Sequence, residues 1–129
     1  MSSVRDKTQL GSLTIRTRRV TDGVRLALFG ELDLHSMALL EQQLSEAERN
    51  GARRIAVDLS SLSFIDSSGL HVLLKAQRRS LEAGRTLSLV PGPPAVHRLF
   101  ELTGLVAIFQ YESGQGDARS LVSSEHSGS

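Results

Sequence analysis

Two adjacent serines, Ser67 and Ser68, lie at the predicted start of a helix, a position where a side chain can be modified. They follow Asp66 and precede Gly69 in the stretch FIDSSGL, at the point where an apolar run passes into a helical pattern. Asp and Ser are preferred N-cap residues. The free amides and the dipole of a helix N-terminus also stabilise anions. A serine here can accept a phosphoryl group, which adds about −1.5 to −2 charges at neutral pH. The segment is therefore either a simple helix cap or a phosphorylation switch.

A second acidic group lies in the stretch GELD, at Glu31 and Asp33. It comes at the end of an alternating apolar pattern and just before Ser36, a candidate N-cap of the next helix. The two carboxylates either contribute to a partner-binding surface or stay solvated where the chain leaves a strand. Acid–base catalysis by a carboxylate pair is disfavoured, because nothing in the sequence indicates a pocket around them.

The other reactive residues exclude several classes of site. The chain has no Cys, which excludes disulfides, thiolate metal sites and cysteine nucleophiles. Its four His residues, at 35, 71, 97 and 126, have no metal-ligand spacing. Ser67, His71 and Asp66 lack the Gly-x-Ser-x-Gly context of a hydrolase, and the sequence has no P-loop. We therefore expect neither a metal nor a cofactor in this chain, and no hydrolase site.

The composition suits one soluble domain. The 129 residues include 15 basic and 14 acidic side chains, a net charge of +1 that disfavours general binding to nucleic acid or membrane surfaces but permits a local patch. The N-terminus lacks the apolar core of a signal peptide, and no apolar run is long enough to span a membrane. We expect a cytoplasmic protein that contacts neither nucleic acid nor membrane directly.

Residue patterning predicts the elements that position the serines. Alternating apolar residues indicate a β-hairpin that turns at Asp22-Gly23. Apolar stripes at helical spacing indicate helices that start near Ser36, Ser67 and Pro94. The predicted strands lie at 13–20, 24–31, 53–59, 86–90 and 105–110, and the predicted helices at 37–50, 67–83 and 94–103.

The order β-β-α-β-α-β-α-β predicts an α/β fold, a single domain in which helices cover a mixed sheet. The crossovers into the later strands should be right-handed and parallel. With aromatics at 4% and no Trp, the core must consist mainly of Leu, Val, Ile and Ala. We expect the domain at 12–111, a flexible N-terminus at 1–11 and a flexible Ser/Gly-rich tail at 112–129.

Several stretches together resemble a known family. VDLSSLSFIDSSGLHVLL, at 57–74, looks like the signature of anti-sigma factor antagonists, whose fold is called the STAS domain. LFGELDLHS at 28–36 and PPAVHRLFELTGL at 93–105 are similar to further segments of that family, in the same order. The resemblance covers about residues 12–111.

The resemblance implies a partner switch, in a regulatory protein that is the substrate of a kinase and not itself an enzyme. In this family an anti-sigma factor that is also a serine kinase phosphorylates the serine directly after the aspartate, here Ser67, with Ser68 as second choice. The unphosphorylated antagonist binds the anti-sigma factor and frees the sigma factor, phosphorylation ends binding, and a serine phosphatase reverses it. ATP and Mg²⁺ belong to the kinase. The implied partner-binding residues are Asp33, Asp66, Ser67, Ser68 and Gly69, in a monomer or weak dimer.

An alternative keeps the fold and changes the function. Domains of this kind also serve as cytoplasmic parts of anion transporters, as subunits of lipid-transport complexes and as stress-sensing scaffolds, without a phosphorylation switch. The chain shows no membrane segment that would accompany a transporter, and its Asp-Ser-Ser-Gly motif favours phosphorylation. The sequence leaves open which sigma factor or anti-sigma factor is involved.

Overall fold

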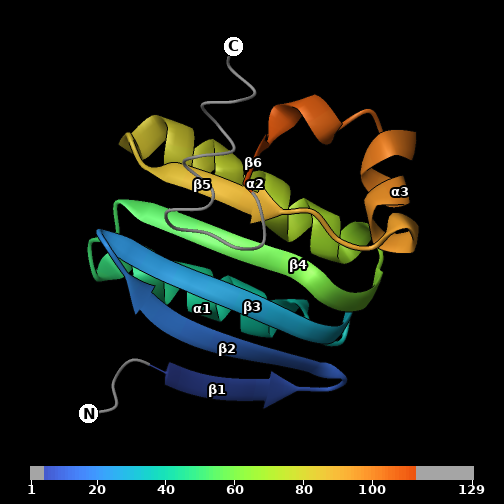
Figure 1. Cartoon of the computed structure of the whole chain (residues 1–129), viewed down its shortest axis with the longest axis horizontal. Helices are drawn as coiled ribbons and strands as arrows, with labels where there is room; N and C mark the ends of the chain where they lie inside the picture. The colour runs from blue at the N-terminus through green and yellow to red at the C-terminus, as the bar shows by residue number, and fades with distance from the viewer. Residues whose placement is uncertain (1–4, 113–129) are drawn as a thin grey trace.

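Six strands form one mixed sheet in the computed structural model, which describes residues 5–112 (Figure 1). Neighbours from β1 to β3 are antiparallel, and neighbours from β3 to β6 are parallel. The predicted hairpin, the mixed sheet and the parallel crossovers are therefore confirmed. The strands, in sheet order, are β1 (Arg5–Leu10), β2 (Leu13–Val20), β3 (Gly23–Leu32), β4 (Arg54–Ile65), β5 (Thr86–Val90) and β6 (Gln110–Tyr111).

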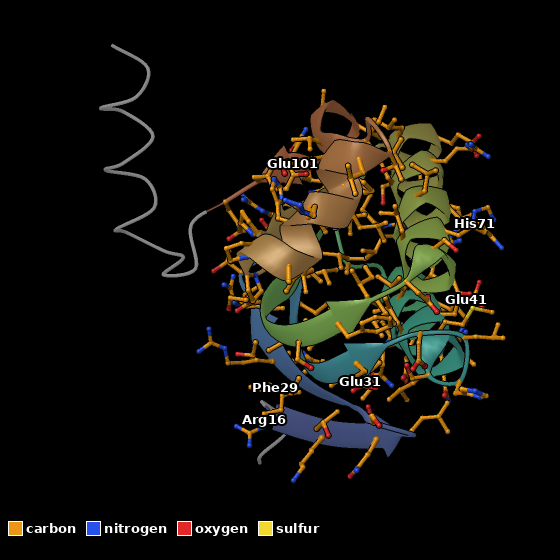
Figure 2. The ribbon with its side chains drawn as sticks, turned by 90° about the vertical axis from the view of Figure 1, so that its right-hand side faces the viewer. Arg16, Phe29, Glu31, Glu41, His71 and Glu101 are labelled. Carbon is orange, nitrogen blue, oxygen red and sulfur yellow. The ribbon has the colours of Figure 1, made fainter. Side chains whose placement is uncertain are left out.

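Helices α1 (Met37–Arg49) and α2 (Ser67–Ala83) cover the same face of the sheet. Helix α3 (Pro94–Leu102) lies at the end where β5 stops (Figure 1). Figure 2 looks onto this end: α1 and α2 lie on the right of the sheet, while Arg16 and Phe29 lie on the left. The opposite face of β1 to β4 is therefore free of these helices.

The core between sheet and helices is aliphatic, as its composition predicts. Leucine dominates the side chains that are fully buried, and two aromatic rings, Phe100 and Phe109, close the end under α3 in an edge-to-face contact with centroids 5.6 Å apart. Glycines end α1 and α2 in left-handed conformation, at Gly51 and Gly84. The largest fully buried residues on the sheet and the two covering helices include Leu13, Ile15, Leu26, Leu28, Leu32, Leu40, Leu44 and Leu73.

The prediction of a flexible segment at 1–11 is wrong for residues 5–10, which form β1. This strand pairs with β2 from Arg5↔Arg18 to Leu10↔Leu13. Its sequence RDKTQL is polar and shows no apolar alternation, so the pattern gave no sign of a strand. An edge strand is held by backbone hydrogen bonds and tolerates polar side chains on both faces. The sheet therefore begins at Arg5 rather than at residue 12.

The predicted last strand, 105–110, is mostly a 3₁₀ turn, η1 (Val106–Ile108), followed by the two residues of β6. The amide of Ile108 donates to the carbonyl of Leu105 at 3.1 Å. A short apolar run does not distinguish a strand from such a turn, which explains the error. Glu112, expected in the tail, donates its amide to the carbonyl of Leu89 at 2.9 Å and so continues the sheet; the rest of the expected tail lies outside the described residues.

Candidate functional site

The carboxyl ends of β3 and β4 bring the two acidic segments together. Leu32 and Ile65 are partners in the parallel register, and an aspartate follows each of them. The amide of Asp66 donates to the carbonyl of Leu32 at 3.2 Å. Asp33 and Asp66 therefore leave the sheet side by side, near the end that carries Glu31 in Figure 2.

Asp66 is the N-cap of α2. Its backbone is extended, and its Oδ1 accepts the amide of Ser68 at 2.9 Å and that of Gly69 at 3.2 Å. The carboxylate thus satisfies two of the amides that a helix N-terminus leaves free. The cap function that the sequence left open between Asp66 and Ser67 belongs to Asp66.

Ser67 is the first residue of α2, and its side chain is exposed, whereas Ser68 is partly buried. Within residues 5–112, the Ser67 hydroxyl makes no hydrogen bond to another side chain or to the backbone. Another protein can therefore reach this hydroxyl without first breaking a hydrogen bond of the described residues. Exposure favours Ser67 over Ser68 as the acceptor.

Gly69 is buried, so it contributes packing rather than a side-chain contact to any partner. A Cβ at this position would lie 2.5 Å from Cγ of Leu32 and 2.8 Å from its Cδ2. Leu32 is itself fully buried and has no free space to move into. The missing side chain therefore lets the first turn of α2 approach the end of β3, which fixes Ser67 relative to Asp33.

A tight turn from Glu31 to Ser36 holds the second acidic segment. Oδ1 of Asp33 accepts the amides of His35 and Ser36, at 3.0 and 3.2 Å. The hydroxyl of Ser36 donates to the carbonyl of Glu31 at 2.8 Å and accepts the amide of Asp33 at 3.0 Å. Asp33 therefore shapes the loop, which leaves Glu31 as the exposed carboxylate of the pair.

Ser36 occupies the N-cap position of α1 as predicted, but its side chain does not cap the helix. The hydroxyl faces backwards into the preceding turn, and the carbonyl of Asp33 accepts the amide of Met37 at 2.8 Å instead. The sequence identified the right position and the wrong bond, because a serine can bond to either side of a helix start.

Replacing the buried Ser36 with alanine should lower the free energy of unfolding by about 2 kcal/mol, since the Glu31 carbonyl and the Asp33 amide both lose a partner. Urea unfolding followed by circular dichroism measures the change. The control is Ser45→Ala on α1, which should change stability by less than about 0.5 kcal/mol. Equal losses in the two variants would show that the hydroxyl of Ser36 has no structural role.

Two exposed hydrophobic residues, Leu34 and Phe64, lie in the segments that carry the acidic residues. Leu34 follows Asp33 and is 61% exposed; Phe64 precedes Ile65 and is 47% exposed. Exposed apolar side chains beside polar groups are found at protein-binding surfaces. Sequence reasoning missed both, although an apolar residue inside the polar turn ELDLHS was an available signal.

The end of the sheet around Ser67 is acidic. The ion pairs of residues 5–112 join Arg25, Lys75 and Arg79 to other carboxylates, and none of them involves Glu31, Asp33 or Asp66. A negative group added at Ser67 would therefore meet carboxylates that no cation neutralises. His71 is exposed on α2 (Figure 2) and makes no hydrogen bond to Ser67 or Asp66, which leaves the hydrolase interpretation without support.

The described residues hold no group of His, Asp or Glu side chains suited to a metal ion. None of their helices has the length and hydropathy needed to cross a bilayer.

The chain is similar in sequence to known proteins over most of the described residues. The sequence model of a family described as "Mlab, STAS domain" matches residues 15–110. The anti-sigma F factor antagonist of Paenibacillus polymyxa is 37% identical over 82 residues, which make up 63% of this chain and 70% of that protein.

Two solved structures of the antagonist SpoIIAA share the fold. The unphosphorylated form has a TM-score of 0.68 and 26% identity, over 88% of this chain and 96% of that one. The phosphorylated form, described as a Bacillus cell fate determinant, has a TM-score of 0.63 and 26% identity, over 78% of this chain and 93% of that one. A protein with this fold is therefore known with and without phosphate.

Proposed function

The protein belongs to the STAS-domain family of anti-sigma factor antagonists, and from this membership we propose that it binds an anti-sigma factor and thereby releases a sigma factor. Members of this family are regulatory binding proteins, and the chain is not an enzyme. The acidic end of the sheet, with exposed Leu34 and Phe64, is the proposed binding surface. Hydrophobic anchors beside polar groups suit a partner that binds and leaves repeatedly.

Phosphorylation of Ser67 is the proposed control of that binding. The observation that carries it is the exposed Ser67 hydroxyl, which takes no part in the helix cap that Asp66 provides. Phosphate at this position adds charge beside Asp33 and Asp66 and raises the electrostatic cost of docking. The proposed partners are an anti-sigma factor that acts as a serine kinase and supplies ATP and Mg²⁺, and a serine phosphatase that restores the hydroxyl.

The direct test incubates the chain with the anti-sigma factor kinase of the same organism and Mg²⁺-ATP, and then maps phosphate by peptide mass spectrometry. We expect one phosphate, on Ser67, in the unaltered protein and in Ser68→Ala, and none in Ser67→Ala. Phosphate on Ser68, or none under conditions where the kinase modifies another substrate, would refute the assignment to Ser67.

A second assay separates antagonism from phosphorylation. The chain is added without ATP to a preformed complex of sigma factor and anti-sigma factor, and free sigma factor is measured by size-exclusion chromatography. Release of sigma factor supports antagonism even if no phosphate is ever found. Retention of the complex at saturating antagonist contradicts the proposed function itself.

The alternative is a subunit of a transport complex that uses the same fold without a switch. The family description "Mlab, STAS domain" is the observation that keeps it in view. Co-purification with a membrane transporter, together with no effect on the sigma factor complex, would favour it. The Paenibacillus relative, named as an antagonist, favours the first function.

A further inference from the structure

The face of the sheet away from α1 and α2 carries a set of basic side chains. Residues such as Ile15 and Leu26 are buried against the helices, so the residues that alternate with them point to the other side. Arg16 and Phe29 mark this side in Figure 2, on the left of the sheet, opposite His71 and Glu41. The alternation places basic residues from β1, β2, β3 and β4 on this side. We call this set the cationic face; it consists of Lys7, Arg16, Arg18, Arg25 and Arg54.

Four of these cations form a continuous path across three strands. Lys7 is the register partner of Arg16, and Arg18 is the register partner of Arg25. Arg16 and Arg18 lie two residues apart on β2, and neighbouring strands lie about 4.8 Å apart. Like charges directly opposite each other destabilise a sheet. Lys7 and Arg16 therefore repel each other in the isolated domain, a cost that an acidic partner would remove, whereas Arg25 already has carboxylate partners within this chain.

The ion pairs of Arg25 indicate which chemical group this face binds. It pairs with Asp58 at 3.6 Å and with Glu112 at 3.2 Å, and all three side chains are largely buried. Among the described residues, Lys7, Arg18 and Arg54 have no ion pair, although all three are exposed. The guanidinium of Arg16 lies 5.1 Å from the centre of the Phe29 ring, which holds it against the sheet.

We propose that the cationic face binds an acidic segment of a partner protein, with Lys7, Arg16 and Arg18 as its main contacts. Carboxylates are the ligands that Arg25 takes from this chain, and guanidinium groups bind them in a planar, bidentate manner. The Phe29 ring is covered by the guanidinium of Arg16, so it offers no free platform for stacking nucleic-acid bases. The face lies apart from Ser67, so this binding does not depend on the proposed switch.

The test measures binding of a fluorescein-labelled octaglutamate peptide to the full chain by fluorescence anisotropy. The face variant combines Lys7→Gln, Arg16→Gln and Arg18→Gln. The control variant, Arg49→Gln with Arg78→Gln and Arg98→Gln, removes the same charge from exposed helix positions. At about 20 mM salt, we expect the face variant to bind at least about 10-fold more weakly than the unaltered chain, and the control less than about 3-fold more weakly.

Three results would overturn the proposal: no detectable binding of octaglutamate at low salt, equal loss in both variants, or tighter binding of oligo-dT or phosphatidylserine vesicles through the same residues. Amide chemical-shift mapping on the unaltered chain gives the answer even if the face variant is unstable. Shifts confined to β1 to β3 support the cationic face, and shifts confined to other elements refute it. Binding of the peptide at this face, in a chain that the kinase does not phosphorylate, would support the cationic face and refute only the proposed switch.

Discussion

A chain with Ser67→Asp is expected to bind its anti-sigma factor at least about 100-fold more weakly than the unaltered chain. The added carboxylate stands beside Asp66 and near Asp33, at an end of the sheet where no ion pair of the described residues neutralises either aspartate. Docking would bury part of this charge, and both desolvation and like-charge repulsion would oppose it. Isothermal titration calorimetry with the purified anti-sigma factor measures the change.

The matched control is Ser67→Asn, which has nearly the same shape without the charge. We expect it to bind within about 5-fold of the unaltered chain, since a neutral polar group at an interface costs far less than an unpaired charge. Aspartate at the start of a helix is favourable to the helix dipole, which offsets its repulsion from Asp66 and Asp33, so Ser67→Asp should unfold at about the same urea concentration as the unaltered chain. Equal affinities of the Asp and Asn variants would refute the electrostatic switch.

The second large effect is expected at Gly30, where alanine should lower the free energy of unfolding by at least about 3 kcal/mol. Gly30 has a φ of +101°, and a Cβ there would lie 1.9 Å from the backbone carbonyl oxygen of Ser12, the residue directly before β2. A backbone atom cannot move aside as a side chain can. The carbonyl of Gly30 also accepts the hydroxyl of Ser63 at 2.9 Å, so the damage reaches β4 just before Asp66.

Gly51→Ala is the matched control for this prediction. Gly51 also has a positive φ, +81°, but a Cβ there meets no atom within 4 Å. Its substitution should cost about 1 kcal/mol, the strain of the backbone conformation alone. Urea unfolding of both variants isolates the contribution of the contact with Ser12. Similar losses would mean that β2 and β3 separate easily and that the close approach is unimportant.

Much of the fold was predictable, because most elements bury one regular stripe of side chains. The hairpin around Asp22-Gly23 and the helix that begins at Ser67 both follow from apolar spacing and local turn chemistry. β1 escaped prediction because backbone pairing alone can hold an edge strand, and polar residues leave no apolar pattern. η1 escaped because three apolar residues suit a strand and a tight turn equally well.

The candidate site was predictable in position and less so in its bonds. Residue types placed Asp66 and Ser67 at a helix start, but both are good caps, and only the coordinates assign the amides of Ser68 and Gly69 to Asp66. The cationic face was not predictable from composition, because its residues come from separate strands and a net charge of +1 conceals it. The pairing of like charges in register appears only after the strands are aligned.

Asp66 caps α2 and Ser67 does not, and this difference has a consequence for the lifetime of the protein in the cell. Because the carboxylate of Asp66 alone caps the start of α2, the phosphate proposed on Ser67 would leave the domain as resistant to proteases as before. Neither form would then be removed selectively by degradation. The proportion of the two forms would follow the opposing rates of kinase and phosphatase, so that one pool of molecules could be reset many times without new synthesis.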